Sequence, residues 1–336
     1  MATVTKSIGA TGRDYATIAL WDAFVPADLV TAGDSHVGEM YNDAEFTGGT
    51  DIGAHTTDST HTMTLTAASG QSFMDNANVR TNALRYNRSN GVGIKTTTNY
   101  KEVLTSILTT YITISRLQMF ISNSGSRATR MYSASGTSVP LIKDCIFETT
   151  NTLATNTALV LINNSRGINL VSIIDTTAAT NGFVISRGPL IGCLAVRPSN
   201  RTAAGYGYIR DSYATAPIIQ SCATFGFTGA INGTFDTTNS KNNATDVASG
   251  LPGSSNQYSV TYSSSTPFQN ATSASSAHDF RSIDGTALAD AGFRDSTDGP
   301  NDISGTARDS TPTIGVWELA AAASYDNKSG MFFVFH

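Results

Sequence analysis

The feature that most constrains the fold is an internal repeat that contains all three cysteines of the 336-residue chain. Its clearest copies begin at Pro140, Pro189 and Pro217 and read PLIKDCIF, PLIGCLAV and PIIQSCATF. Looser copies place Leu117 and Leu170 at the position of the cysteine. Positions 117, 145, 170, 193 and 222 are then equivalent, with steps of 28, 25, 23 and 29 residues.

A second series of short apolar segments runs between these copies. The segments centre on Met131, Val160, Val184, Tyr208 and Ile231, with steps of 29, 24, 24 and 23 residues. Two interleaved series with one period predict a coil that contains at least two strands per turn. Such coils bury their apolar faces only by stacking on one another.

We therefore predict an all-β chain that folds as a single-stranded right-handed parallel β-helix, a solenoid. A β-sandwich is the alternative, since its strands are also short and separated by regular turns. A sandwich does not explain a repeated proline-aliphatic-cysteine motif.

The shared position of Cys145, Cys193 and Cys222 predicts an interior structural stack in which each thiol behaves as a small apolar group. Three cysteines this far apart do not form a dense disulfide framework, and no CxxC pair indicates zinc. Asn163, Asn164 and Asn169 are predicted to be turn or ladder residues.

The chain divides into four predicted parts. Residues 1–60 form an N-terminal cap with a short helix within 14–24, and residues 61–275 form the coils. Residues 276–319 form a C-terminal cap, and residues 320–336 form a tail that is a candidate anchor.

Two segments resemble a known family. Within the predicted C-terminal cap the matching segments are Asp279–Arg281, Gly285–Gly292, Asp302–Arg308 and Ile314–Glu318. In this order they resemble the terminal segment of pectin-lyase-like right-handed β-helix proteins, which implies that fold. Thr286-Ala287 and Thr313 depart from the family pattern. Residues 7–15, with Trp21 following, resemble the opening of β-helix proteins encoded as tailed-phage virion structural proteins.

Charge and hydropathy exclude several classes of protein. The chain has 26 acidic and 21 basic residues, a net charge of −5, and its arginines are scattered. Nucleic-acid binding would require a basic surface that neutralises phosphates, so no nucleic-acid partner is expected. No apolar run reaches the roughly 20 residues of a membrane span, and the N-terminus lacks the apolar core of a signal peptide. We expect a protein that is made in a host cytoplasm, without membrane contact.

The sequence indicates no catalytic residue, metal site or cofactor. Acids are few between positions 105 and 236: Asp144, Glu148, Asp175, Asp211 and Asp236. Asp144 and Asp175 lie about one coil apart and could share a face, but such acids are more often solvated turn caps. His36, His55 and His61 have no recognised metal-ligand spacing.

The expected function is a non-enzymatic virion structural protein of a tailed bacteriophage: a capsid decoration protein, head spike or fibre at the virion surface. The alternative is a tailspike or secreted enzyme that binds or degrades polysaccharide as a lyase or glycoside hydrolase. Expected partners are further copies of the chain, with a homotrimer favoured, other capsid proteins and a host surface glycan. The candidate partner-binding residues are Met331, Phe332, Phe333, Val334 and Phe335; a strand folded back on the flank is an equal alternative for them.

Overall fold

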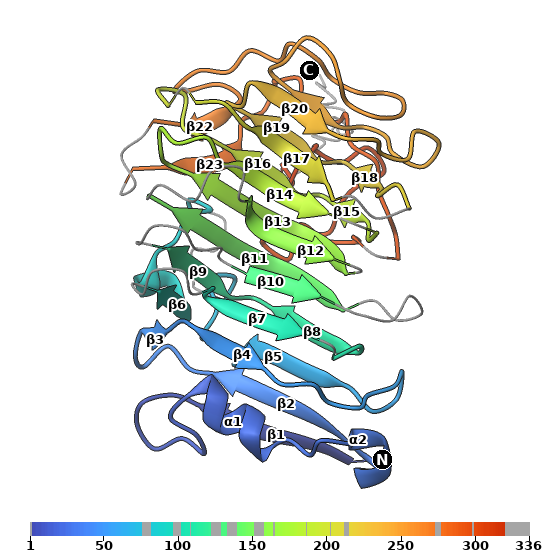
Figure 1. Ribbon diagram of the computed structural model, residues 1–336. Helices are drawn as coiled ribbons and strands as arrows, with labels where there is room; N and C mark the ends of the chain where they lie inside the picture. Colours follow the sequence, from blue (N-terminus) through green and yellow to red (C-terminus); the bar gives the residue numbers. More distant parts are fainter. Residues whose placement is uncertain are drawn as a thin grey trace, which may run out of the picture.

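The protein is built from parallel strands in two long sheets, as the computed structural model shows (Figure 1). The structure describes residues 2–75, 82–96, 102–107, 109–121, 129–132, 140–150, 158–163, 165–185, 187–201, 203–211, 215–272, 277–297 and 299–319. All described pairings within the two long sheets are parallel, which excludes the antiparallel β-sandwich.

The first sheet contains 14 described strands. They are β1 (Ala2–Ile8), β2 (Asp34–Met40), β3 (Phe46–Thr47), β5 (Met63–Ala67), β6 (Gly93–Thr96), β8 (Ile112–Ser115), β9 (Gln118–Ile121), β11 (Leu141–Thr149), β13 (Arg166–Ile174), β15 (Leu190–Ile191), β16 (Leu194–Val196), β18 (Ile219–Gln220), β19 (Ala223–Phe225) and β21 (Ala244–Thr245).

The second sheet contains seven described strands. They are β4 (Thr50–Ile52), β7 (Leu104–Ile107), β10 (Thr129–Tyr132), β12 (Ala158–Asn163), β14 (Asn181–Ile185), β17 (Tyr206–Arg210) and β20 (Gly229–Asn232). From β3 onward, one or two strands of the first sheet are followed along the chain by one strand of the second, and the strands of each sheet pair with those of the neighbouring repeats. This arrangement is compatible with stacked coils.

The helix predicted within residues 14–24 is α1 (Ile18–Phe24). It begins after Thr17, whose side chain accepts a hydrogen bond from the Leu20 N–H at 3.2 Å. Trp21 is fully buried, and a Cβ added at Gly38 of β2 would lie 2.7 Å from its ring. The other short helices among the described residues are α2 (Leu29–Ala32) and the 3-10 helix η2 (Arg88–Asn90).

The strands of the predicted N-terminal cap belong to the same sheets as the later repeats. β2 pairs in register with β5, and β4 pairs with β7. The strand pairing therefore runs through residue 60 without a break.

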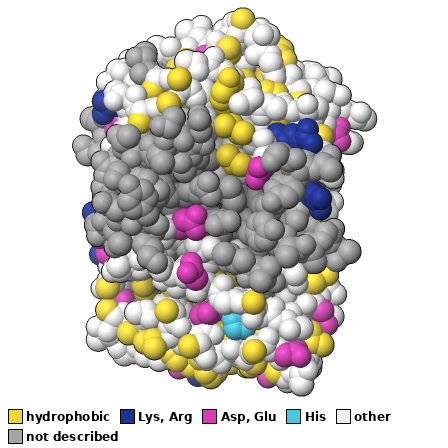
Figure 2. All heavy atoms as spheres, viewed as in Figure 1, with side chains coloured by type: hydrophobic (Ala, Val, Ile, Leu, Met, Phe, Trp, Pro, Cys, Tyr) yellow, Lys and Arg dark blue, Asp and Glu magenta, His cyan; other side chains and the backbone are white. Residues whose placement is uncertain are grey.

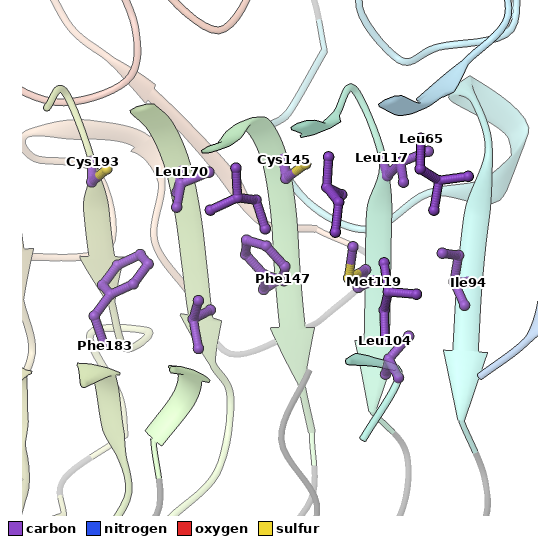
Figure 3. Packing of buried hydrophobic residues seen from close by; sticks show 14 of the residues in the cluster. Leu65, Ile94, Leu104, Leu117, Met119, Cys145, Phe147, Leu170, Phe183 and Cys193 are labelled. Atoms are coloured by element: carbon purple, nitrogen blue, oxygen red, sulfur yellow. The ribbon is translucent and has the colours of Figure 1, made fainter. Parts of the chain in front are cut away.

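The first predicted series is confirmed by the strand register. Cys145 lies opposite Leu170, and the residues that follow the other equivalent positions pair in the same register. Figure 3 shows Leu117, Cys145, Leu170 and Cys193 in one row inside the molecule. All are buried, so the period of the motif is the period of the core.

The second predicted series is only partly correct. Tyr208 pairs with Ile231 as predicted, but its partner on β14 is Phe183, not Val184. Val184 pairs with Ile209, and both are partly exposed. A shift of one residue along a strand turns a side chain to the other face. The Phe183 and Tyr208 rings stack inside the molecule with centroids 5.5 Å apart.

A row of left-handed residues bends the first sheet at one corner. They are Arg116, Asp144, Asn169, Gly192 and Ser221, with φ between 51° and 63°, each directly before a position of the first series. Glycine, asparagine and aspartate tolerate this conformation best. The bend separates β8 from β9 and β15 from β16. Asn242, with φ 53°, continues the row.

The C-terminal segment, defined here as residues 277–319, folds back along this row of bends. It begins with β23 (Asp279–Ser282), which pairs antiparallel with β22 (Phe268–Asn270). The Asn242 amide then donates to the Ala291 carbonyl at 2.8 Å, and the Asn169 amide donates to the Asn301 carbonyl at 2.9 Å. The segment thus covers the corner of several repeats.

Candidate functional site

Arg308 fastens the C-terminal segment to the row of bends. It is 3% exposed, and its guanidinium donates to the carbonyls of Thr313 at 3.0 Å and Gly315 at 2.6 Å. It also donates to Oδ1 of Asn169 at 3.2 Å and lies 3.5 Å from the Glu318 carboxylate. Arg308 therefore joins two turns of the segment to a bend of the first sheet.

The same contact explains why one copy of the repeat reads PLIGC. A Cβ at Gly192 would lie 2.7 Å from Nη2 of Arg308 and 2.9 Å from Oδ1 of Asn169. Glycine also adopts the φ of +60° at this bend without strain.

Asp144 lies beside a small hollow between the bends and the C-terminal segment. The hollow has a volume of about 130 Å³ and is lined in part by Lys143, Asp144 and Asp302. The Asn169 amide donates to Oδ1 of Asp144 at 2.9 Å. Burial raises the pKa of Asp144 to about 6, although this hydrogen bond opposes the shift.

A second buried cluster joins Glu148, Asp175 and His278. Glu148 is 1% exposed and accepts a hydrogen bond from the Tyr86 N–H at 2.8 Å. Asp175 accepts one from Nε of Arg201 at 2.7 Å. His278 lies between the carboxylates, with Nδ1 3.9 Å from Glu148 and Nε2 3.7 Å from Asp175.

The structure therefore places Asp175 with Glu148 and not with Asp144. In the strand register Asp144 lies opposite Asn169, six residues before Asp175. The Asp175 N–H donates to the Thr149 carbonyl at 2.9 Å, so this acid adjoins the end of β11. Sequence reasoning did not identify His278, which enters from the C-terminal segment.

Asp211 and Asp236, the other two acids of this region, belong to neither cluster. Asp236 is a turn cap, since its carboxylate accepts from the N–H groups of Thr238 and Asn239 at 2.8 and 2.9 Å. Asp211 follows β17, and its N–H donates to the Ile185 carbonyl at 2.8 Å.

A larger hollow lies on the outer side of the second sheet. It has a volume of about 400 Å³ and is lined by Ala179, Asn181, Ala204, Gly205, Tyr206, Ile209, Thr228 and Asn232. Figure 2 shows hydrophobic side chains gathered over the upper part of this face, where β14, β17 and β20 lie. The lining combines one aromatic ring with amide and hydroxyl groups.

The N-terminal histidines make separate contacts. Nε2 of His55 lies 3.0 Å from the Asp22 carboxylate, and this hydrogen bond raises the pKa of His55; Nδ1 lies 2.9 Å from the Pro26 carbonyl. His61 lies 2.9 Å from Asp58, and His36 is buried against Phe24. Among the residues described, no group of three side chains is arranged to hold a metal ion.

The three cysteines are free thiols with buried side chains. The Cys222 thiol lies 3.4 Å from the Leu190 carbonyl of the preceding repeat. Burial raises the pKa of Cys145 to about 12, and it also raises that of Cys193 well above its usual range. The tail residues 331–335 lie outside the described residues, as does Asn164.

No protein-family model matches the sequence, and no curated protein matches it. None of the described helices has the length and apolar character of a membrane span.

Proposed function

We propose that the protein is a right-handed β-helix of the pectin-lyase-like kind and serves as a non-enzymatic structural protein on the surface of a tailed-phage particle. In this role it is a capsid decoration protein, a head spike or a fibre. The fold part of the proposal is supported by the parallel pairing that recurs once per repeat. It is also supported by the contacts of Arg308, because this residue belongs to the C-terminal motifs that resemble the family.

The observation that best supports a structural role is that the buried carboxylates bond to other groups of the protein. Asp144 is bonded to Asn169, Glu148 to the Tyr86 N–H and Asp175 to Arg201. Hydrolysis of a glycosidic bond requires two carboxyl groups that face the substrate from either side. These acids instead fix the C-terminal segment and neighbouring repeats in place.

The outer face of the second sheet is the surface we assign to association of three copies. Val184 and Ile209 are neighbours in register and are partly exposed there, with Asn232 next along the row. Exposed apolar side chains that lie next to one another favour contact with another protein. The Met331–Phe335 tail is the second candidate contact, with other virion proteins.

The experiment that tests the proposal is detection of the protein on intact particles of the phage that encodes it. Purified particles are analysed by mass spectrometry and labelled with an antibody raised against the folded protein. We expect a fixed copy number per particle and surface labelling without disruption. A protein that stays in the lysate supernatant while the particles are complete contradicts the proposal.

Association is tested by sedimentation of the purified chain. Ile209→Asp is expected to convert the trimer to a monomer, because it places a charge in the apolar row. Leu20→Asp is the matched control, since Leu20 is 53% exposed on α1 and outside this row. A monomeric wild-type chain, or equal effects of the two changes, would contradict the assignment of this surface to association.

The alternative function is binding or cleavage of a polysaccharide, and the hollow beside Tyr206 favours it. An aromatic ring next to Asn181 and Asn232 offers stacking and hydrogen bonds to a sugar. A glycan array with wild-type protein and Tyr206→Ala tests this function. Release of oligosaccharides that is lost in Asp144→Asn or Asp211→Asn would replace the structural proposal with an enzymatic one.

A further inference from the structure

His278 is a fully buried histidine whose two ring nitrogens make no hydrogen bond of normal geometry. A contact with the Thr272 backbone favours a proton on the ring less than the Asp175 charge does. Leaving buried polar atoms unpaired is unfavourable, because they lose their hydrogen bonds to water without replacement. The Glu148 carboxylate lies 3.9 Å from Nδ1 and the Asp175 carboxylate 3.7 Å from Nε2, both beyond hydrogen-bond length. A small rotation of these side chains would therefore satisfy both nitrogens at once.

The surrounding charges limit which proton arrangement is stable. Arg201 is bonded to Asp175, Arg85 faces both Glu148 and His278, and the backbone of Thr272 also faces the ring. A neutral imidazole has one N–H and one lone pair. If both carboxylates were ionised, that lone pair would point at a second acceptor. If the imidazole were charged, three ions would share a buried space.

We propose that Glu148 and His278 form a proton-dependent latch for the C-terminal segment. In it the protonated Glu148 carboxyl donates to Nδ1 of neutral His278, and the Nε2–H of His278 donates to ionised Asp175. One proton then satisfies both ring nitrogens and leaves Asp175 paired with Arg201. The latch joins β23 to the ends of β11 and β13.

The electrostatics of the two groups agree with this arrangement. Burial, helped by the charge of Asp175, raises the pKa of Glu148 to about 8. Burial lowers the pKa of His278 to about 4, although Asp175 opposes the shift. At neutral pH the carboxyl therefore holds the proton and the imidazole is neutral.

These directions define the pH range in which the latch is closed. The raised pKa of Glu148 gives stability that is complete below about pH 4.5 and is lost as the pH rises through 8. The lowered pKa of His278 gives stability that is complete above about pH 6.5 and is lost as the pH falls through 4. Between pH 4.5 and 6.5 the loss of stability from Glu148 and the gain from His278 cancel. Between pH 6.5 and 8 only the loss remains, so the opening equilibrium increases by up to about tenfold per pH unit.

Local hydrogen exchange of the full-length protein tests the latch. The amide of Phe280 is the reporter, because it donates to the Ala83 carbonyl at 3.1 Å and lies two residues from His278. After correction for intrinsic exchange, its opening equilibrium is expected to rise from pH 6.5 to 8 in wild-type protein. In Glu148→Gln it should stay flat, because the amide donates at every pH. Glu39→Gln, a change of the same kind on β2, should behave as wild type.

A measurement on the unaltered chain keeps the proposal testable if the variant does not fold. Histidine labelled with ¹⁵N reports the tautomer of each of the five imidazoles, and His278→Gln assigns the signal. We expect neutral His278 with the proton on Nε2 from pH 5.5 to 7.5. An imidazolium signal at pH 7, an Nδ1–H tautomer, or an opening equilibrium in Glu148→Gln that still rises with pH would overturn the latch.

Discussion

Replacement of Arg308 by methionine tests whether one buried guanidinium holds the C-terminal segment on the row of bends. Methionine keeps an unbranched chain of similar length but donates no hydrogen bond. The change leaves three acceptors without their donor: the carbonyls of Thr313 and Gly315, and Oδ1 of Asn169. Glu318, 3.5 Å away, also loses its nearest cation.

The magnitude follows from these contacts. Each buried acceptor left unpaired costs about 1–3 kcal/mol, and loss of one partner of a buried ion pair costs about 3–5 kcal/mol. The contributions do not add, because all of them belong to one side chain and the segment can relax. Burial also raises the pKa of Glu318 to about 7, so its charge is incomplete at neutral pH. We expect a loss of about 3–5 kcal/mol in the free energy of unfolding.

The assay is urea denaturation followed by tryptophan fluorescence. The chain has two tryptophans, and Trp317 is buried in the C-terminal segment while Trp21 is on α1. In a Trp21→Phe background only Trp317 fluoresces, so its signal follows release of the C-terminal segment. Comparing Arg308→Met in this background and in the wild-type background separates that release from global unfolding. Arg294→Met is the control, because Arg294 is exposed in the same segment, and it should change stability by less than about 0.5 kcal/mol. The reasoning is refuted if the two arginine variants lose equal stability.

Three further predictions follow from the stack, the bend and the tail. A thiol reagent should react with Cys145, Cys193 and Cys222 only after unfolding, and rapid labelling of the native protein would contradict their burial. Cys193→Asp should cost about 3 kcal/mol or more in the free energy of unfolding, because it buries an unpaired charge. Gly192→Ala should destabilise by about 1–3 kcal/mol because its Cβ meets a guanidinium, as thermal melting will measure. Deleting residues 321–336 should leave the β-type circular dichroism and melting temperature unchanged but abolish association with other virion proteins, the partners assigned to the tail. A truncated chain that unfolds would make the tail an integral strand.

The sequence predicted the first series correctly because its cysteines mark one core position unambiguously. The second series has no such marker. Its segments are apolar at neighbouring positions, as in Phe183-Val184 and Tyr208-Ile209, so the pattern does not distinguish the inner from the outer residue. The strand register makes that choice, and register depends on residues of adjacent repeats.

The row of bends was present in the sequence but was not recognised. The residue before the marker position is aspartate, asparagine, glycine or serine in four of the five repeats, types that favour left-handed conformation or turns. The exception is Arg116. His278, in contrast, carries no local signal, because its partners Glu148 and Asp175 are more than 100 residues away.

At Asn169 the side-chain type is determined both by the left-handed backbone of the bend and by the hydrogen bonds to the C-terminal segment that covers it. Its amide donates to Asp144 and to the Asn301 carbonyl, while its oxygen accepts from Arg308. Asparagine is suited to this position because it combines donors and an acceptor on a side chain that tolerates φ 51°.

Two substitutions separate the backbone requirement from the side-chain requirement at this bend. Asn169→Gly keeps the conformation and loses the hydrogen bonds, so we expect a cost of about 1–3 kcal/mol in urea denaturation. Asn169→Asp keeps the shape but cannot donate, and it places a carboxylate oxygen within hydrogen-bond distance of Asp144 and of a carbonyl. It should therefore cost more than the glycine variant at pH 7. Its deficit should shrink as the pH falls toward 5, because burial already raises the pKa of Asp144 to about 6 and a second carboxylate raises it further. If the aspartate variant is as stable as wild type at pH 7, the amide donors of Asn169 are not what holds the C-terminal segment to this bend.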